Sequence, residues 1–64
     1  MFELIKPILE ESQQNKKGIT FYVNGATVIG YVTKIIGDKA VEAKNQRSSK
    51  VLIAIDRIDA LEIA

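Results

Sequence analysis

The spacing of apolar residues changes at Gly18. Before it, Phe2, Ile5 and Leu9 recur at roughly the 3.6-residue period of an α-helix, with charged and amide side chains at most positions between them. This pattern predicts a helix over residues 2–17. After Gly18, β-branched and alternating apolar residues predict strands over 19–24, 26–36, 39–44, 50–55 and 58–63.

The limits of this helix depend on a proline and a glycine. Pro7 lacks an N–H and its ring crowds the preceding turn, so it is tolerated mainly near a helix start. The helix therefore either begins near Phe2 and carries Pro7 just inside its beginning, or begins at Pro7 itself. Gly18 is expected to end it, with Lys16 and Lys17 placed against the negative end of the helix dipole.

Asn24-Gly25 is the strongest turn signal in the chain. A type I′ turn needs positive φ at both central positions, and Asn-Gly reaches it at the least cost, so the first two strands are expected to form a hairpin. Gly30 then falls inside the second strand, where a glycine usually marks a sharp bend or a close approach of another backbone. Together these features predict a curled sheet.

The last third of the chain indicates self-association. Residues 51–55 are apolar at every position, so both faces of this strand are expected to be covered, and natural proteins avoid leaving such a strand bare at a sheet edge. A chain of 64 residues has a small core, and without cysteine or histidine it has no disulfide and no good metal ligand to support it. Head-to-tail pairing between copies through residues 50–63 closes into a ring when the rotation per subunit divides a full turn.

Composition narrows the function classes. A formal net charge of +1 is a weak argument for nucleic acid, but Lys44, Arg47 and Lys50 form a basic patch with no acidic residue between them. Without histidine, cysteine or carboxylates paired in an apolar setting, we expect no catalysis, and no metal or cofactor is implied. We expect a single domain over residues 1–64 that is soluble and cytoplasmic, because cysteine and any membrane-length apolar run are absent.

The chain resembles the Sm-like family, which includes LSm and Hfq-like proteins. The resemblance is carried by the run Tyr22-Val-Asn-Gly25 with Gly30 after it, by Lys6-Pro7-Ile8-Leu9, and by the Ile-rich residues 51–63. It implies a mainly β fold with one N-terminal helix, in which five strands form a strongly bent small barrel of the SH3-like kind. It also implies homo-oligomeric rings of about five to seven subunits, joined by strand pairing, that bind single-stranded RNA or act as RNA chaperones.

The resemblance also implies a uridine-binding site at the ring pore. Family members build it from two short elements, one after the second strand and one between the last two strands. Neither family signature is intact here, but charged residues occupy both positions: Asp38, Lys39, Asp56 and Arg57.

A second implied surface lies on the opposite face, where Hfq-like proteins stack adenines on an aromatic residue and on backbone near the Asn-Gly turn. The corresponding residues are Phe21, Asn24, Gly25 and Thr27. The basic rim of Hfq-like rings corresponds to the segment that contains Lys16 and Lys17.

Each candidate also has a purely structural interpretation. Phe21 suits packing as well as base stacking, and the turn alone explains Asn24 and Gly25. Lys39 and Arg57 suit solvated turns, with a local ion pair to a neighbouring Asp, as well as phosphate contact. Two function classes stay open: an Sm-like ring that binds single-stranded RNA, and a scaffold ring with protein partners in which RNA binding is reduced or lost.

Overall fold

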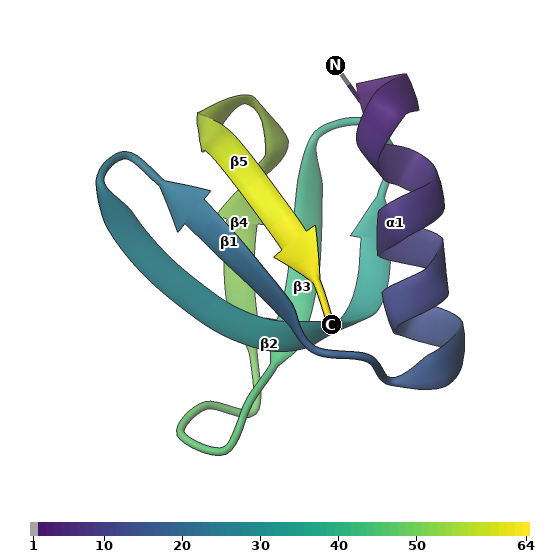
Figure 1. Ribbon diagram of the computed structural model, residues 1–64, viewed down its shortest axis with the longest axis vertical. Helices are drawn as coiled ribbons and strands as arrows, with labels where there is room; N and C mark the ends of the chain where they lie inside the picture. Colours follow the sequence, from purple (N-terminus) through teal and green to yellow (C-terminus); the bar gives the residue numbers. More distant parts are fainter. Residues whose placement is uncertain (1) are drawn as a thin grey trace.

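The computed structural model describes residues 2–64 and has the expected order of one helix followed by five strands (Figure 1). Every predicted strand is present, with ends that agree to within one residue, and a 3₁₀ turn occupies the expected break before the last strand. The elements are α1 (Phe2–Asn15), β1 (Ile19–Val23), β2 (Ala26–Ile36), β3 (Ala40–Lys44), β4 (Val51–Ala54), η1 (Ile55–Arg57) and β5 (Ile58–Ile63).

The start of α1 follows the first of the two arrangements considered above, because the helix begins at Phe2 and carries Pro7 inside it. One face of α1 is apolar and buries Ile5 and Leu9 against the sheet. Leu4, in contrast, is 78% exposed on the outer side of the helix. No helix within residues 2–64 has the length and hydropathy needed to cross a membrane.

The end of α1 differs from the prediction. The helix stops at Asn15, and the left-handed residue that follows it is Lys16 (φ 55°), not Gly18. The Lys17 N–H donates to the Ser12 carbonyl over 3.2 Å, which is the 6→1 bond of a Schellman motif. Lys16 therefore occupies the position that usually falls to glycine, and Gly18 belongs to the linker into β1.

Ser12 joins the helix to the sheet, a role that the apolar pattern did not reveal. Its side chain is buried; the hydroxyl donates to the Lys17 carbonyl (2.6 Å) and accepts from the Val32 N–H of β2 (2.9 Å). A buried N–H without a partner costs about 1–3 kcal/mol. Ser12 supplies that partner at the point where the pairing of β2 with β3 shifts register, between Val32 and Lys34.

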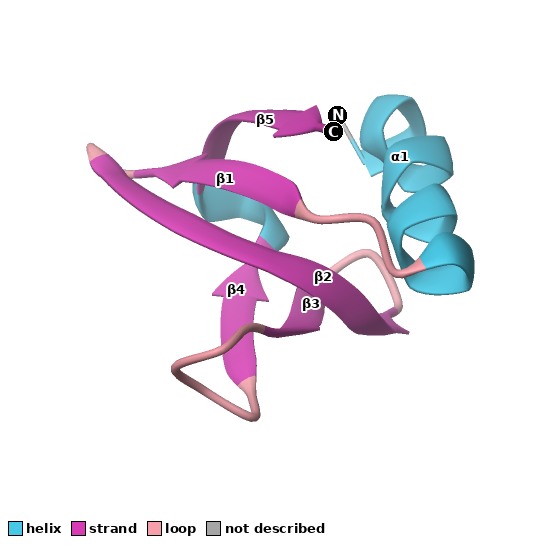
Figure 2. Ribbon diagram, turned by 60° about the horizontal axis from the view of Figure 1, so that its bottom comes forward, coloured by secondary structure: helices cyan, strands magenta, loops and turns pink. Residues whose placement is uncertain are grey.

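The strands form one antiparallel sheet in the order β4-β3-β2-β1-β5, and β2 belongs to both of its halves. Residues 26–30 of β2 pair with β1, and residues 31–36 pair with β3. In Figure 2, β2 runs as one long strand between the β1–β5 half and the β3–β4 half, and α1 lies beside it.

The sheet is open and not strongly curled, which corrects the expectation of a curled sheet in the form of a strongly bent small barrel. Within residues 2–64, β4 and β5 form the two edges and do not pair with each other. They are consecutive in the chain, but η1 carries the backbone from one half of the sheet to the other instead of turning it into a hairpin. Cover of β4 is also incomplete, because Ile53 is buried while Leu52 is 64% exposed.

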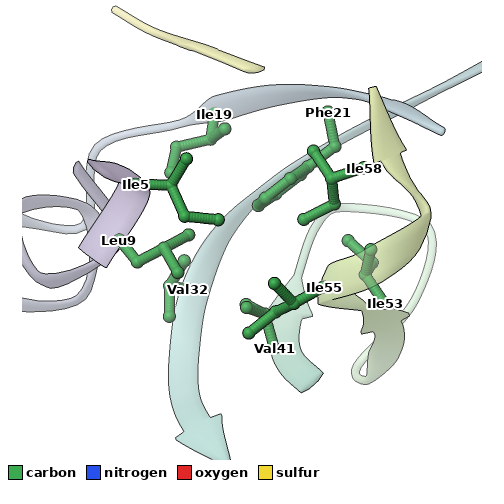
Figure 3. Packing of buried hydrophobic residues seen from close by; sticks show 9 residues of the cluster. All are labelled: Ile5, Leu9, Ile19, Phe21, Val32, Val41, Ile53, Ile55 and Ile58. Atoms are coloured by element: carbon green, nitrogen blue, oxygen red, sulfur yellow. The ribbon is translucent and has the colours of Figure 1, made fainter. Parts of the chain in front are cut away.

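The core lies between the two halves of the sheet, and α1 packs against one side of it (Figure 3). Side chains of β1 and of the start of β5 face those of β3 and β4 across this space. The cluster contains Ile5, Leu9, Ile19, Phe21, Val32, Val41, Ile53, Ile55 and Ile58.

Gly30 lies where β2 changes partner from β1 to β3. A Cβ atom at this position would lie 2.8 Å from the carbonyl oxygen of Lys44, closer than real Cβ contacts allow. Of the two roles considered for Gly30, a sharp bend or a close approach of another backbone, the structure shows the close approach. It also places Lys44, the last residue of β3, directly beside the middle of β2.

We expect Gly30→Ala to lower the free energy of unfolding by about 1–3 kcal/mol, because the new methyl group must displace the backbone of Lys44. Urea denaturation followed by circular dichroism measures the change. Gly18→Ala is the matched control, since no atom lies within 4 Å of the added Cβ and φ is not left-handed; it should change stability by less than about 0.5 kcal/mol. Equal effects of the two substitutions would contradict the crowding at Gly30.

Candidate nucleic-acid interface

An open groove follows β2, beside the end of β3 and the loop after it. Residues 27–31 of β2 and residues 44–48, at the end of β3 and in the loop after it, supply most of its lining, and Gly18 and Val51 complete it. The groove exists because β3 ends against Gly30, so that the chain leaving β3 passes close to β2. It brings together residues from two of the predicted candidate sets: Thr27 from the hairpin face, and Lys44 and Arg47 from the basic patch.

Asn45 holds the β3–β4 loop in place against the groove. Its Nδ2 donates to the Ile29 carbonyl (2.7 Å), and its Oδ1 accepts from the N–H groups of Arg47 (2.9 Å) and Ser48 (2.8 Å). The Asn45 N–H also donates to the Ser48 carbonyl (3.0 Å). This is an Asx-type turn, a signal that sequence reasoning missed although Asn before a polar loop is typical of one.

The charged side chains that line the groove are all positive. Lys44 and Arg47 line it, and no acidic residue does. Within residues 2–64 neither cation takes part in an ion pair, whereas the Nζ of Lys50 lies 3.8 Å from the Oε1 of Glu42. Because no carboxylate competes for them, Lys44 and Arg47 are free to bind an anion such as phosphate.

Apolar side chains share the groove with these cations. Tyr31 is the cross-strand partner of Lys44, and Ile29, on the same face of β2, is 59% exposed. Nucleic-acid bases present flat apolar faces beside their charged phosphates, so this mixed lining suits a single strand better than it suits an inorganic anion.

The structure brings together the two elements that the family resemblance placed at a pore. The Ile55 N–H donates to the Lys39 carbonyl (2.9 Å), so the turn with Asp38 and Lys39 lies beside η1, which contains Asp56 and Arg57. All four charged side chains are exposed, and within residues 2–64 they form no ion pair with one another. Two positive and two negative groups give this surface no net charge, unlike the groove.

The hairpin-face candidates separate into different roles. Asn24 (φ 53°) and Gly25 (φ 84°) form the expected turn with positive φ at both positions, and the Asn24 N–H donates to Asp59 Oδ2 over 2.9 Å. Phe21 is fully buried and points into the core in Figure 3. Of the two interpretations considered for Phe21, packing and base stacking, the structure therefore supports packing. Only Thr27 is exposed and reaches the groove.

The two lysines of the predicted rim follow α1. Both are exposed, but Lys17 forms an ion pair with Glu11 over 2.8 Å and is partly neutralised by it. Lys16 makes no ion pair within residues 2–64. Neither side chain lines the groove, so they add at most long-range attraction to it.

Tyr22 and Glu62 form a polar pair on the exposed face of β1 and β5, which sequence reasoning missed. The Tyr22 hydroxyl donates to Glu62 Oε1 over 2.7 Å, and Tyr22 is the cross-strand partner of Thr27. The pKa of Tyr22 is raised above the ordinary value of 10.0. The largest cause is the hydrogen bond that the Tyr22 hydroxyl donates to Glu62, and the second is the negative charge of the Glu62 carboxylate. The pair depends on β1 lying beside β5, a contact across 40 residues of sequence that no local pattern indicates.

Comparison with known proteins found no match among protein-family models, curated proteins or solved structures. The interpretation of the chain therefore rests on the structural features described above. Residues 2–64 define an α+β domain with one N-terminal helix and an open five-stranded antiparallel sheet. Its candidate interface is the basic groove over β2, and its candidate assembly surfaces are the two free sheet edges.

We expect Tyr22 to ionise above pH 10, and Glu62→Gln to lower its pKa by removing the negative charge. Tyrosinate absorbance in a Tyr31→Phe background reports Tyr22 alone, because the chain has only two tyrosines. Folding raises the pKa of Tyr22, so the hydrogen bond to Glu62 stabilises the folded state fully below the unfolded-state pKa of about 10. This stabilisation is lost as the pH rises through the folded-state pKa. A Tyr22 pKa that Glu62→Gln leaves unchanged would contradict the pairing.

Proposed function

We infer that this chain is an Sm-like subunit that assembles into a ring through its free sheet edges and binds single-stranded RNA in the groove over β2. The observation that carries the RNA-binding part is the groove itself, which holds Lys44 and Arg47 with Tyr31 and Ile29 beside them. Among residues 2–64 these two cations form no ion pair and no acidic residue lines the groove. The strand order and the N-terminal helix are consistent with the Sm-like resemblance seen in the sequence.

Assembly is supported by the nature of the two edges. β4 presents an unpaired backbone edge together with Leu52, 64% exposed, and β5 presents the other edge. Exposed apolar edge strands invite pairing with another chain. Because the two edges of one chain differ, pairing of β4 with β5 of the next copy is heterologous and yields a ring of about five to seven subunits at a suitable rotation angle.

The charge distribution favours the groove over the pore turns as the main RNA contact. Phosphates gain most from cations without neighbouring carboxylates, which describes Lys44 and Arg47. Lys39 and Arg57 lie among Asp38 and Asp56, so any phosphate there meets equal numbers of opposite charges. In a ring, the groove repeats once per subunit and offers one strand several equivalent sites.

We expect the purified chain to elute as an oligomer, and Leu52→Lys to shift it toward monomer, since a lysine on an edge strand disfavours pairing with another chain. Size-exclusion chromatography with light scattering measures the mass. Leu4→Lys is the matched control, because it places the same charge on an exposed leucine of α1, away from both edges, and should leave the mass unchanged. A monomeric wild-type mass at high micromolar concentration would exclude ring assembly.

We expect labelled oligo-A and oligo-U to bind with micromolar or tighter affinity at low salt, and Lys44→Gln with Arg47→Gln to weaken binding roughly tenfold. Loss of two phosphate contacts should also flatten the slope of log affinity against log salt by about 1.4. Fluorescence anisotropy at low and physiological salt provides both values.

The control for this charge removal is Lys6→Gln with Lys34→Gln. These two lysines line a separate hollow between α1 and the end of β2, so they remove the same charge without touching the groove. Loss of binding only in Lys39→Gln with Arg57→Gln would move the RNA to the pore turns. Absence of binding to any oligonucleotide at low salt would favour the scaffold ring with protein partners.

A further inference from the structure

A second surface adjoins the groove, on the outer face of β1 and β5. Tyr22 is 39% exposed there, and its cross-strand neighbours are both small, Thr27 on β2 and Ala60 on β5. Cross-strand neighbours on one face lie roughly 5 Å apart between Cβ atoms. Thr27 also lines the groove, so the Tyr22 ring stands one strand away from the groove lining.

Glu62 gives this aromatic surface a polar edge. Its Oε1 accepts from the Tyr22 hydroxyl (2.7 Å), which fixes the carboxylate beside the ring, and its Oε2 has no hydrogen-bond partner within residues 2–64. Asp59, another carboxylate of β5, is bound through Oδ2 to the Asn24 N–H (2.9 Å). Glu62 is therefore held beside the ring and keeps one oxygen open to a further donor.

An ionised carboxylate accepts hydrogen bonds and cannot donate them. Consider a base that stacks on Tyr22 with its Watson–Crick edge toward Glu62. The more hydrogen-bond donors this edge carries, the more strongly Glu62 favours binding of the base. Guanine offers two adjacent donors, N1–H and N2–H; adenine and cytosine offer one amino group. Uracil offers a single N–H between two carbonyl oxygens, which repel the carboxylate. Single-stranded RNA is commonly recognised in this way, by stacking together with contacts to base edges.

We propose that Tyr22 and Glu62 form a base-reading site that selects guanine over uracil in a single strand whose phosphates lie on Lys44 and Arg47. The inference rests on the proposed RNA-binding function and adds a base preference to it. The proposal also explains why the Glu62 carboxylate lies close to a groove proposed to bind negatively charged RNA. Glu62, on β5, meets the neutral edge of the base while the phosphates lie in the groove along β2, two strands farther along the sheet.

The test uses heptauridylate and three variants of it in which the central base is guanine, adenine or cytosine, with the full chain in anisotropy titrations. The wild type should bind the guanine heptamer at least about fivefold tighter than heptauridylate. Glu62→Gln should remove this preference and tighten heptauridylate binding, because an amide lacks the repulsive charge. Tyr22→Ala should weaken all four heptamers about tenfold through loss of stacking.

Two further variants separate base reading from stability. Tyr22→Phe keeps the ring but leaves Glu62 unanchored, so it should retain affinity and lose part of the guanine preference. Glu10→Gln removes an exposed carboxylate of α1 that lies outside this face, and it should leave the preference intact.

Equal binding of all four heptamers, still weakened by Lys44→Gln with Arg47→Gln, would overturn base reading and leave the RNA-binding proposal standing. A guanine preference that Glu62→Gln preserves would likewise overturn it. Failure of every heptamer to bind at low salt would overturn both proposals together.

Discussion

The contact between Gly30 and the carbonyl of Lys44 is the constraint on which the rest of this structure depends. It lets the backbone at the end of β3 pass directly beside β2 at the residue where β2 exchanges one partner strand for the other. The two halves of the sheet can then share one strand and enclose a common core. The same approach places Lys44 and the loop after it along β2, so the candidate interface is a by-product of how the sheet is built.

Local sequence signals were sufficient for most of the fold. Apolar spacing located the helix and all the strands, and Asn24-Gly25 located the hairpin because its backbone requirement is met by few residue pairs. The signals failed where tertiary contacts decide the outcome. Gly18 was the better helix stop by propensity, but Ser12 binds the residues after α1 and makes Lys16 turn instead. The strongly bent barrel that the family resemblance implied was also wrong, since the curvature of the sheet depends on contacts between distant strands and not on local spacing.

The candidate site was predictable only in pieces. Lys44, Arg47 and Thr27 were each identified, but belonged to separate sets until the groove brought them together. Phe21 was the aromatic residue of β1 proposed for base stacking. Neighbouring residues of a strand point to opposite faces, and here Phe21 points into the core while Tyr22 is exposed. The partner of Tyr22 lies on β5, and pairing between the first and last strands leaves no trace in local spacing.

The two hydrogen bonds of Ser12 bear on how the domain opens. One hydroxyl group connects the residues after α1 to the backbone of β2, so the helix end cannot fray without exposing the Val32 amide. Small domains commonly exchange their amide hydrogens through independent local openings of terminal elements. Because Ser12 joins the terminal helix to the central strand, we expect the Val32 amide to exchange when α1 undocks rather than when the strands separate.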